Sequence, residues 1–279
     1  MSHYQIIGGG FAGIKLAKKL SSKYFQVILV DKNNYHQFQP LLYQVAAGGV
    51  EPSSISFPLR KIFRDYRNVF LRVAEAKKVN IHTQIITTTA GEIPYDYLVM
   101  AHGAVTNYFG NETLQQNAFS MKSVSEALLL RNTLLQNYEK SLAVIDEEKQ
   151  ALLNVVIVGG GPTGVELAGA IAEMRNNILP KEYNEVNFWQ MHIYLIEAAP
   201  ALLSAMSATS SSAMQSYLQK MGVEVITEAA VKNYDDDNDL CNLFISKMTL
   251  HILKDNIRYT MLRYIGNFLS KCQHCPLCI

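Results

Sequence analysis

The sequence predicts an α/β fold that contains one structural unit twice, and three observations support this. A glycine-rich turn with the spacing Gly-x-Gly-x-x-Gly occurs at residues 8–13 and again at residues 159–164. A short apolar run precedes each turn and apolar residues at helical spacing follow it, as expected for a buried strand that leads into a helix. In both copies an acidic residue ends the next apolar run. Each copy therefore reads as strand, glycine turn and helix.

The three glycines of each turn have different physical roles. They are Gly8, Gly10 and Gly13 in the first copy and Gly159, Gly161 and Gly164 in the second. The first permits a tight turn, the second lets the backbone approach a pyrophosphate, and the third lets the helix pack close to the strand. The helix N-terminus then offers unpaired N–H groups and a partial positive charge to the phosphates. The pattern predicts two Rossmann-like dinucleotide-binding domains.

The acidic residues complete the dinucleotide pattern. The run FQVILVD ends in Asp31, and MHIYLIE ends in Glu197, which an insertion, NNILPKEYNEVNFWQ, places further from its turn. A carboxylate there accepts hydrogen bonds from ribose hydroxyls and repels a 2′-phosphate, so the sequence predicts NADH rather than NADPH. The alternative is that one of the two turns holds no ligand. If both bind, hydride transfer between a nicotinamide and a flavin is the most economical chemistry.

Composition limits the classes of partner. The chain has 279 residues, of which 49% are hydrophobic and 18% charged, and its formal net charge is +1. This charge provides no broad basic field for nucleic acid. No stretch reaches the roughly 18 apolar residues that a membrane-spanning helix needs. We therefore expect a cytoplasmic protein without transmembrane spans.

Three longer stretches carry a family resemblance. The stretches DKNNYHQFQPLLYQVAAGGVEPSSISFPLRKIFR, YDYLVMAHGAVTNYFG and VVIVGGGPTGVELAGAIAEM closely resemble the type II NADH:quinone oxidoreductases, which are single-chain NADH dehydrogenases that do not pump protons. The resemblance extends to about Tyr234. It implies a fold like that of the disulfide reductases, with FAD in the N-terminal domain and NADH in an inserted second domain. It also implies electron transfer to a membrane quinone, peripheral contact with the inner face of the cytoplasmic membrane, and a homodimer. The family's quinone pocket and C-terminal membrane anchor belong to a part that this sequence does not match.

The resemblance assigns roles to individual residues. Gly8, Gly10, Gly13 and Asp31 would hold the adenosine diphosphate half of FAD. The segment around Pro40, Leu41 and Leu42 would lie near the flavin ring; the alternative is an ordinary apolar loop packed on the core. At Gly103 the chain would pass close to the flavin nucleotide. The family usually has Ala-Thr-Gly here, and His102 replaces the threonine, more as a structural variant than a catalytic one.

Glu166 is the catalytic candidate. It occupies the position at which the first copy has Lys15, so the two copies differ in charge there. By resemblance to the family pattern GVELAG, it would lie beside the nicotinamide and flavin rings and orient the hydride donor. The alternative is a carboxylate in the first helical turn that only complements the helix dipole, which stabilises by about 0.3–1 kcal/mol.

The cysteines argue against a thiol mechanism and against a metal site. No cysteine precedes Cys241, so the redox-active pair of the disulfide reductases is excluded from the two predicted domains. Cys272, Cys275 and Cys278 have ligand-like spacing, but a fourth ligand is lacking. We interpret them as an incidental cluster and predict no metal site.

The predicted organisation has four parts. An incomplete FAD-binding domain spans residues 1–120, a connecting helix 121–150, and a truncated NADH-binding domain 151–235. Ser123 and Glu126 predict a capping box at the start of the connecting helix. Residues 236–279 do not match the family, as a frameshift or premature stop would produce. The leading interpretation is an FAD-dependent NADH:quinone oxidoreductase or its truncated, inactive remnant, and the alternative is a non-catalytic NADH-binding fragment that has lost the flavin and quinone sites.

Overall fold

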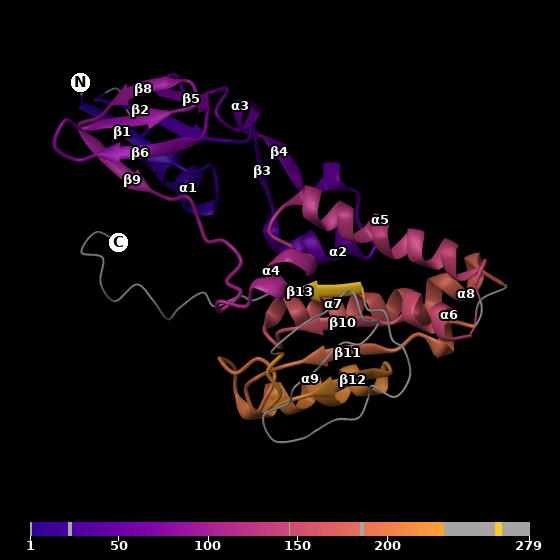
Figure 1. Ribbon diagram of the computed structural model, residues 1–279. Coiled ribbons are helices and arrows are strands. Elements are labelled where there is room, and N and C mark those ends of the chain that lie inside the picture. Colours follow the sequence, from indigo (N-terminus) through magenta and orange to yellow (C-terminus); the bar gives the residue numbers. More distant parts are fainter. Residues whose placement is uncertain (1, 22–23, 145, 185–186, 232–259, 264–279) are drawn as a thin grey trace. The chain divides into compact units, whose positions relative to one another are not determined.

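The computed structural model describes residues 2–21, 24–144, 146–184, 187–231 and 260–263 (Figure 1). The chain divides into two compact units. Unit 1 comprises Met1–Gln39 and Glu51–Val105, and unit 2 comprises Pro40–Val50 and Thr106–Ile279. Each unit contains one four-stranded parallel sheet.

The sheet of unit 1 has the strand order β5-β2-β1-β9. Its strands are β1 (Ser2–Ile7), β2 (Phe25–Asp31), β5 (Val69–Val73) and β9 (Tyr97–Met100). All of its strand pairs are parallel. Helix α1 (Phe11–Lys19) connects β1 to β2 and buries Gly13 and Ala17. The core is the apolar face between this helix, α3 (Leu59–Ile62) and the sheet, with Ile6, Val27 and Leu29 fully buried.

Two small antiparallel sheets complete unit 1. The first pairs β3 (Tyr35–Gln37) with β4 (Ser56–Pro58), so that His36 lies opposite Phe57. Short 3₁₀ turns at Gln39–Leu41 and Pro52–Ser54 flank these strands. The second is a meander of β6 (Ala76–Asn80), β7 (Ile85–Thr88) and β8 (Gly91–Pro94).

The sheet of unit 2 repeats the topology of unit 1. Its order is β12-β11-β10-β13, again with parallel pairs throughout. The strands are β10 (Val155–Val158), β11 (Ile193–Ile196), β12 (Val223–Ile226) and β13 (Thr260–Arg263). Helix α7 (Pro162–Glu173) follows β10 as α1 follows β1. The prediction of one unit used twice is therefore confirmed at the level of strand order.

Figure 1 also shows the other helices of unit 2. They are α2 (Leu42–Ala46), α4 (Glu112–Asn117), α5 (Val124–Ser141), α6 (Asp146–Leu153), α8 (Leu179–Glu182) and α9 (Ala208–Lys220). Of these, α9 packs beside β12. Helix α2 packs against α5 and α7, which places residues 42–46 in unit 2. Leu114 of α4 joins Val156 and Ile196 in a core cluster, so α4 also belongs to this unit.

These contacts shift the unit boundaries from those expected. Residues 40–50 and 106–120, which the sequence analysis assigned to the first domain, pack within unit 2. The reason is that their apolar side chains, such as Leu42 and Leu114, are buried there. Residues 236–279 were expected not to match the family; strand β13 lies within this range and pairs with β10.

The expected connecting helix begins as predicted but is not continuous. The capping box of Ser123 and Glu126 is present in both directions, and this prediction is confirmed. The prediction of one long helix was wrong, because helix α5 ends at Ser141 and the following helix, α6, packs against α5.

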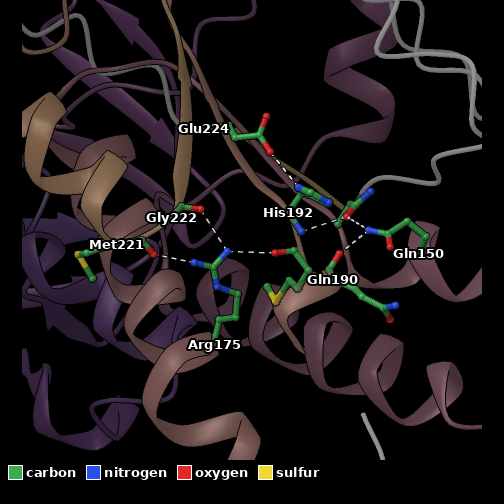
Figure 2. Close-up of polar contacts among 9 residues, drawn as sticks. Gln150, Arg175, Gln190, His192, Met221, Gly222 and Glu224 are labelled. Carbon is green, nitrogen blue, oxygen red and sulfur yellow. Dashed lines mark hydrogen bonds and ion pairs between the residues drawn. The ribbon is translucent and has the colours of Figure 1, made fainter. Parts of the chain in front are cut away.

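Arg175 anchors the insertion of the second copy to the sheet (Figure 2). It lies in a short π-helix, Met174–Ile178, and only 6% of its surface is exposed. Its guanidinium donates to the carbonyl oxygens of Met221 (2.6 Å), Gly222 (3.1 Å) and Met191 (3.0 Å). Burial removes water from the guanidinium and thereby lowers the pKa of Arg175. The three carbonyl oxygens replace the water that the guanidinium has lost. By binding all three, Arg175 links the end of α9 to the residues just before β11 and β12.

We predict that Arg175→Met destabilises unit 2 because three carbonyl groups lose the guanidinium as a donor, although that of Met221 keeps the side-chain amide of Asn176. The expected loss is about 1–3 kcal/mol of unfolding free energy, measured by urea denaturation. Lys220→Met, an exposed change at the end of α9, is the control and should have an effect below about 0.5 kcal/mol. Equal losses in the two variants would contradict the anchoring role.

Candidate functional site

The first and third glycines of each turn make contacts that no other residue allows. Gly8 and Gly159 have φ angles of +111° and +114°, a backbone region that L side chains rarely adopt. A Cβ on Gly13 would lie 1.9 Å from the carbonyl oxygen of Gly8, and a Cβ on Gly164 would lie 1.9 Å from that of Gly159. Both distances are far below van der Waals contact. The predicted tight turn and close helix packing are confirmed in each copy.

The second glycine of each turn faces open space. A Cβ at Gly10 or Gly161 would have no atom within 4 Å. These residues are also the N-caps of α1 and α7, and neither helix has a capping side chain or an acidic residue in its first turn. Among the described residues, neither glycine N–H has an acceptor. Each turn thus presents an open, positively polarised backbone surface that fits a phosphate.

The two acids hold the turns from the end of the neighbouring strand. In unit 1, Asp31 accepts from the N–H of Gly9 (2.6 Å) through Oδ2 and from the N–H of Asn33 (2.7 Å) through Oδ1. Each carboxylate has about four acceptor positions, of which these bonds use two. Capacity for ribose hydroxyls therefore remains.

Glu197 repeats this arrangement in unit 2. It accepts from the N–H of Gly160 (2.5 Å) through Oε2 and from the N–H of Ala199 (2.7 Å) through Oε1. The insertion before β11 therefore does not displace the acid from its turn. The structure brings each predicted acid together with its predicted turn.

Gly9 and Gly160 lie between the first and second glycines of the two patterns, and each is called the middle glycine of its turn. The carbonyl of the middle glycine is also bound in both copies. In unit 1, Nδ1 of His36 lies 3.1 Å from the carbonyl oxygen of Gly9. In unit 2, the backbone N–H of Leu203 donates to the carbonyl oxygen of Gly160 at 2.8 Å. Neither His36 nor Leu203 was identified from the sequence pattern as part of the turn. His36 lies in the quoted family stretch, but only the pairing of β3 with β4 brings it to the turn.

Gly103 lies just after the strand that borders the first turn. Ala101 donates its N–H to the carbonyl oxygen of Ile7 (2.7 Å), and its own carbonyl would clash with a Cβ on Gly8 at 2.2 Å. Gly103 has a φ of +74° with open space around it, and His102 is exposed. Its contact with a flavin nucleotide stays a prediction.

Glu166 and the segment at residues 40–42 belong to the same unit. Pro40 is exposed, Leu41 is half-buried, and Leu42 is buried with 2% exposure at the start of α2, which packs against α7. The burial of Leu42 is what the alternative of an apolar loop packed on the core expects. Whether Pro40, Leu41 and Leu42 lie near a flavin ring stays a prediction.

The structure places Glu166 in the second turn of α7. The helix starts at Pro162, and its first turn has no acidic residue. The helix-dipole alternative was wrong in placing this carboxylate in the first turn, where such an effect is concentrated. The side chain is exposed overall, yet partial burial of the carboxyl raises the pKa of Glu166. A carboxyl with this mixed environment remains a candidate for a catalytic or positioning role.

The described part of the chain contains no group of three or more His, Cys, Asp or Glu side chains that could hold a metal ion. The cysteines at 272, 275 and 278 lie outside the described residues. None of the described helices combines the length and apolar character that crossing a membrane requires.

Comparison with known proteins agrees with this geometry. The model of the pyridine nucleotide-disulphide oxidoreductase family matches residues 2–262. The chain belongs to this family. The match continues past residue 235, where the sequence analysis expected the family pattern to end. The fold is therefore that of the FAD- and NAD-dependent disulfide-reductase class, and the family supports the use of FAD and NADH.

Individual relatives refine the picture. The chain is 37% identical to the type II NADH:quinone oxidoreductase Ndh of Mycobacterium tuberculosis over 82% of this chain and 51% of that protein. It is 31% identical to the mitochondrial external alternative NADH-ubiquinone oxidoreductase of Yarrowia lipolytica, over 83% and 42%. The resemblance to type II enzymes is confirmed. The chain spans about half the length of the curated relatives it matches.

A solved structure shares the fold. NDH2 of Plasmodium falciparum in complex with NADH superposes with a TM-score of 0.84 at 24% identity, over 95% of this chain and 55% of that one. At this identity the similarity supports the fold alone.

We predict that Gly164→Ala and Gly161→Ala differ sharply in stability, although both add one methyl group to the same turn. Gly164→Ala forces a Cβ against the Gly159 carbonyl and should cost about 3 kcal/mol or more. Gly161→Ala enters open space at an ordinary φ of −73° and should stay within about 0.5 kcal/mol of the parent. Thermal unfolding followed by circular dichroism measures both, and equal stabilities would contradict the described turn.

Proposed function

We propose that this protein is an FAD-dependent NADH:quinone oxidoreductase. The observation that carries the proposal is the duplicated turn. Two copies on one chain share a positive-φ first glycine, an open second glycine and an acid bound to the middle glycine. Relatives named as type II NADH:quinone oxidoreductases support the choice of reaction. Bound FAD would supply a two-electron acceptor for hydride from NADH and would pass the electrons to a membrane quinone.

The two units would divide the cofactors. In the proposal, Gly8, Gly10, Gly13 and Asp31 of unit 1 hold the adenosine diphosphate half of FAD. The turn of unit 2, from Gly159 to Gly164, binds NADH in the same way. The open N–H groups of Gly10 and Gly161 would bind the pyrophosphates, and the carboxylates of Asp31 and Glu197 would bind the ribose hydroxyls. The negative charge of Glu197 would exclude a nucleotide with a 2′-phosphate.

Glu166 would act at the reacting end of the nicotinamide. It extends from α7, whose N-terminus carries the Gly161 amide, so one helix would position both the pyrophosphate and the reacting ring. The carboxylate would hold the ring at the correct angle for hydride transfer rather than move a proton. Correct orientation of this kind accounts for much of the rate of enzymatic transfer reactions.

A second candidate is a nucleotide-binding protein without catalysis. The observation that favours it is that the chain spans about half the length of its curated relatives. In this candidate the turn of unit 2 binds NADH, while flavin and quinone do not bind. Peripheral membrane contact and a homodimer belong only to the first candidate.

The two candidates predict different spectra for the purified protein. The proposed enzyme is yellow, its flavin absorbance bleaches within the mixing time on addition of NADH, and NADPH at the same concentration bleaches it at least tenfold more slowly. The recovery of absorbance on addition of a soluble quinone tests the second half-reaction. A colourless protein whose melting temperature still rises with NADH would overturn the proposal in favour of the second candidate.

Glu166→Gln tests the proposed role of this carboxylate. We expect the rate of flavin reduction by NADH to fall at least tenfold, or about 1.4 kcal/mol in the barrier, with little change in NADH affinity. Glu173→Gln changes an exposed carboxylate at the end of the same helix and is the matched control. Stopped-flow absorbance measures the rate, and an unchanged rate in Glu166→Gln would remove the residue from the mechanism.

The same variant has a predicted dependence on pH. Because the folded state raises the pKa of Glu166, the parent protein loses some stability as the pH rises through this value. Glu166→Gln should therefore be equal to or slightly more stable than the parent above that pKa. Below the ordinary carboxyl value of 4.5 the advantage should disappear. Melting temperatures at a series of pH values measure the difference.

A further inference from the structure

Gly9 has both of its backbone polar groups held by side chains. Its N–H donates to Oδ2 of Asp31 at 2.6 Å, and its carbonyl oxygen lies 3.1 Å from Nδ1 of His36. Of these two contacts, the dinucleotide-binding pattern predicts only the one with Asp31. The histidine is an additional contact in the same turn, and it comes from the short strand β3.

The partner of His36 determines which ring nitrogen carries its proton. A carbonyl oxygen can only accept, so Nδ1 must be the donor in this bond. Neutral imidazole has one protonated nitrogen, and the bond therefore selects the Nδ1–H tautomer. The choice of tautomer gives the contact a signature that mere packing of the ring would not produce.

The ring of His36 is also held by aromatic contacts. Phe11, the first residue of α1, lies edge-on to it with ring centres 4.9 Å apart. Phe38 packs edge-on against Phe11 at 5.5 Å. Pairing of His36 with Phe57 across β3 and β4 fixes the backbone from which the ring extends. The ring is thus fixed by the strand behind it and by Phe11 at its side.

The bond to the Gly9 carbonyl has a consequence one atom further along the chain. The carbonyl of Gly9 and the N–H of Gly10 belong to one planar trans peptide, so they point in opposite directions. Holding the carbonyl toward His36 therefore holds the Gly10 N–H toward the opposite side. That N–H has no acceptor among the described residues, and the space at Gly10 is open.

Unit 2 makes the same bond by a different means. The backbone N–H of Leu203 donates to the Gly160 carbonyl at 2.8 Å. Leu203 has a φ of +50°, a conformation that costs a leucine about 1–2 kcal/mol. A strained residue at the corresponding contact indicates that the orientation of this peptide matters in both units. In unit 1 a side chain performs this task and can be tested by substitution.

We propose that His36 is a positioning residue of the unit 1 turn, whose Nδ1–H bond to the Gly9 carbonyl aims the Gly10 N–H at a dinucleotide phosphate. The inference rests on the proposed function in taking that dinucleotide to be FAD. It concerns affinity for the cofactor and assigns His36 no part in hydride transfer.

Two substitutions separate the hydrogen bond from the packing of the ring. His36→Phe keeps an aromatic ring beside Phe11 but removes the donor, and His36→Asn keeps a donor near the position of Nδ1 but removes the ring. We expect His36→Phe to raise the dissociation constant of FAD for the apoprotein about fivefold to tenfold. His36→Asn should restore affinity to within about twofold of the parent. Quenching of flavin fluorescence measures the constants.

Two controls test whether the loss of FAD affinity comes from the turn of unit 1. His82→Phe changes an exposed histidine of unit 1 away from the turn and should leave FAD affinity unchanged. The dissociation constant of NADH, measured by protein fluorescence, should be the same in all variants because unit 2 relies on Leu203. If His36→Phe binds FAD as tightly as the parent, or if both His36 variants weaken it equally, the inference is wrong.

A measurement without FAD separates this inference from the proposed function. Nitrogen-15 NMR of the parent apoprotein identifies the protonated ring nitrogen, and we expect Nδ1. The amide signal of Gly10 should move in His36→Phe and stay near the parent position in His36→Asn. A parent that binds no FAD refutes the proposed function, while these signals still test the bond. An Nε2-protonated ring would overturn the inference even if FAD binds.

Discussion

The close approach of a helix to the end of a strand is the constraint on which both units depend. With no Cβ at Gly13 and Gly164, α1 and α7 reach a position where a methyl group would lie 1.9 Å from a backbone oxygen. Because of this approach, a turn of only three residues separates the end of the strand from the start of the helix in each unit. It leaves backbone N–H groups at the open end of each turn, where a phosphate can bind them. In both units the acid and the open second glycine belong to the turn that this contact closes.

The two copies show which parts of the arrangement are required and which are interchangeable. Both use a positive φ at the first glycine, an open second glycine and an acid that accepts from the middle glycine. They differ in what holds the carbonyl of the middle glycine, which is His36 in unit 1 and the Leu203 backbone in unit 2. The geometry of the turn is thus preserved, while its outer support is free to change.

The second copy accommodates an insertion between its helix and its second strand without altering the site. Arg175, which directly precedes the insertion, binds carbonyls at the end of α9 and before β11, at the N-terminal ends of the strands and away from the glycine turn. The burial of a guanidinium is tolerable there because three backbone oxygens replace its water. A longer connection therefore changes the surface of unit 2, while Glu197 still reaches Gly160.

The sequence by itself determined the two turns, their acids, the capping box at Ser123 and the family, because these depend on residue identity at short spacing. Glycine without a side chain and an acid at a strand end leave a readable pattern. Only the tertiary structure decided that residues 40–50 and 106–120 pack in unit 2, that the connecting helix divides, and that His36 meets Gly9. These features depend on contacts between distant segments, for which burial and strand pairing, rather than local spacing, select the partner.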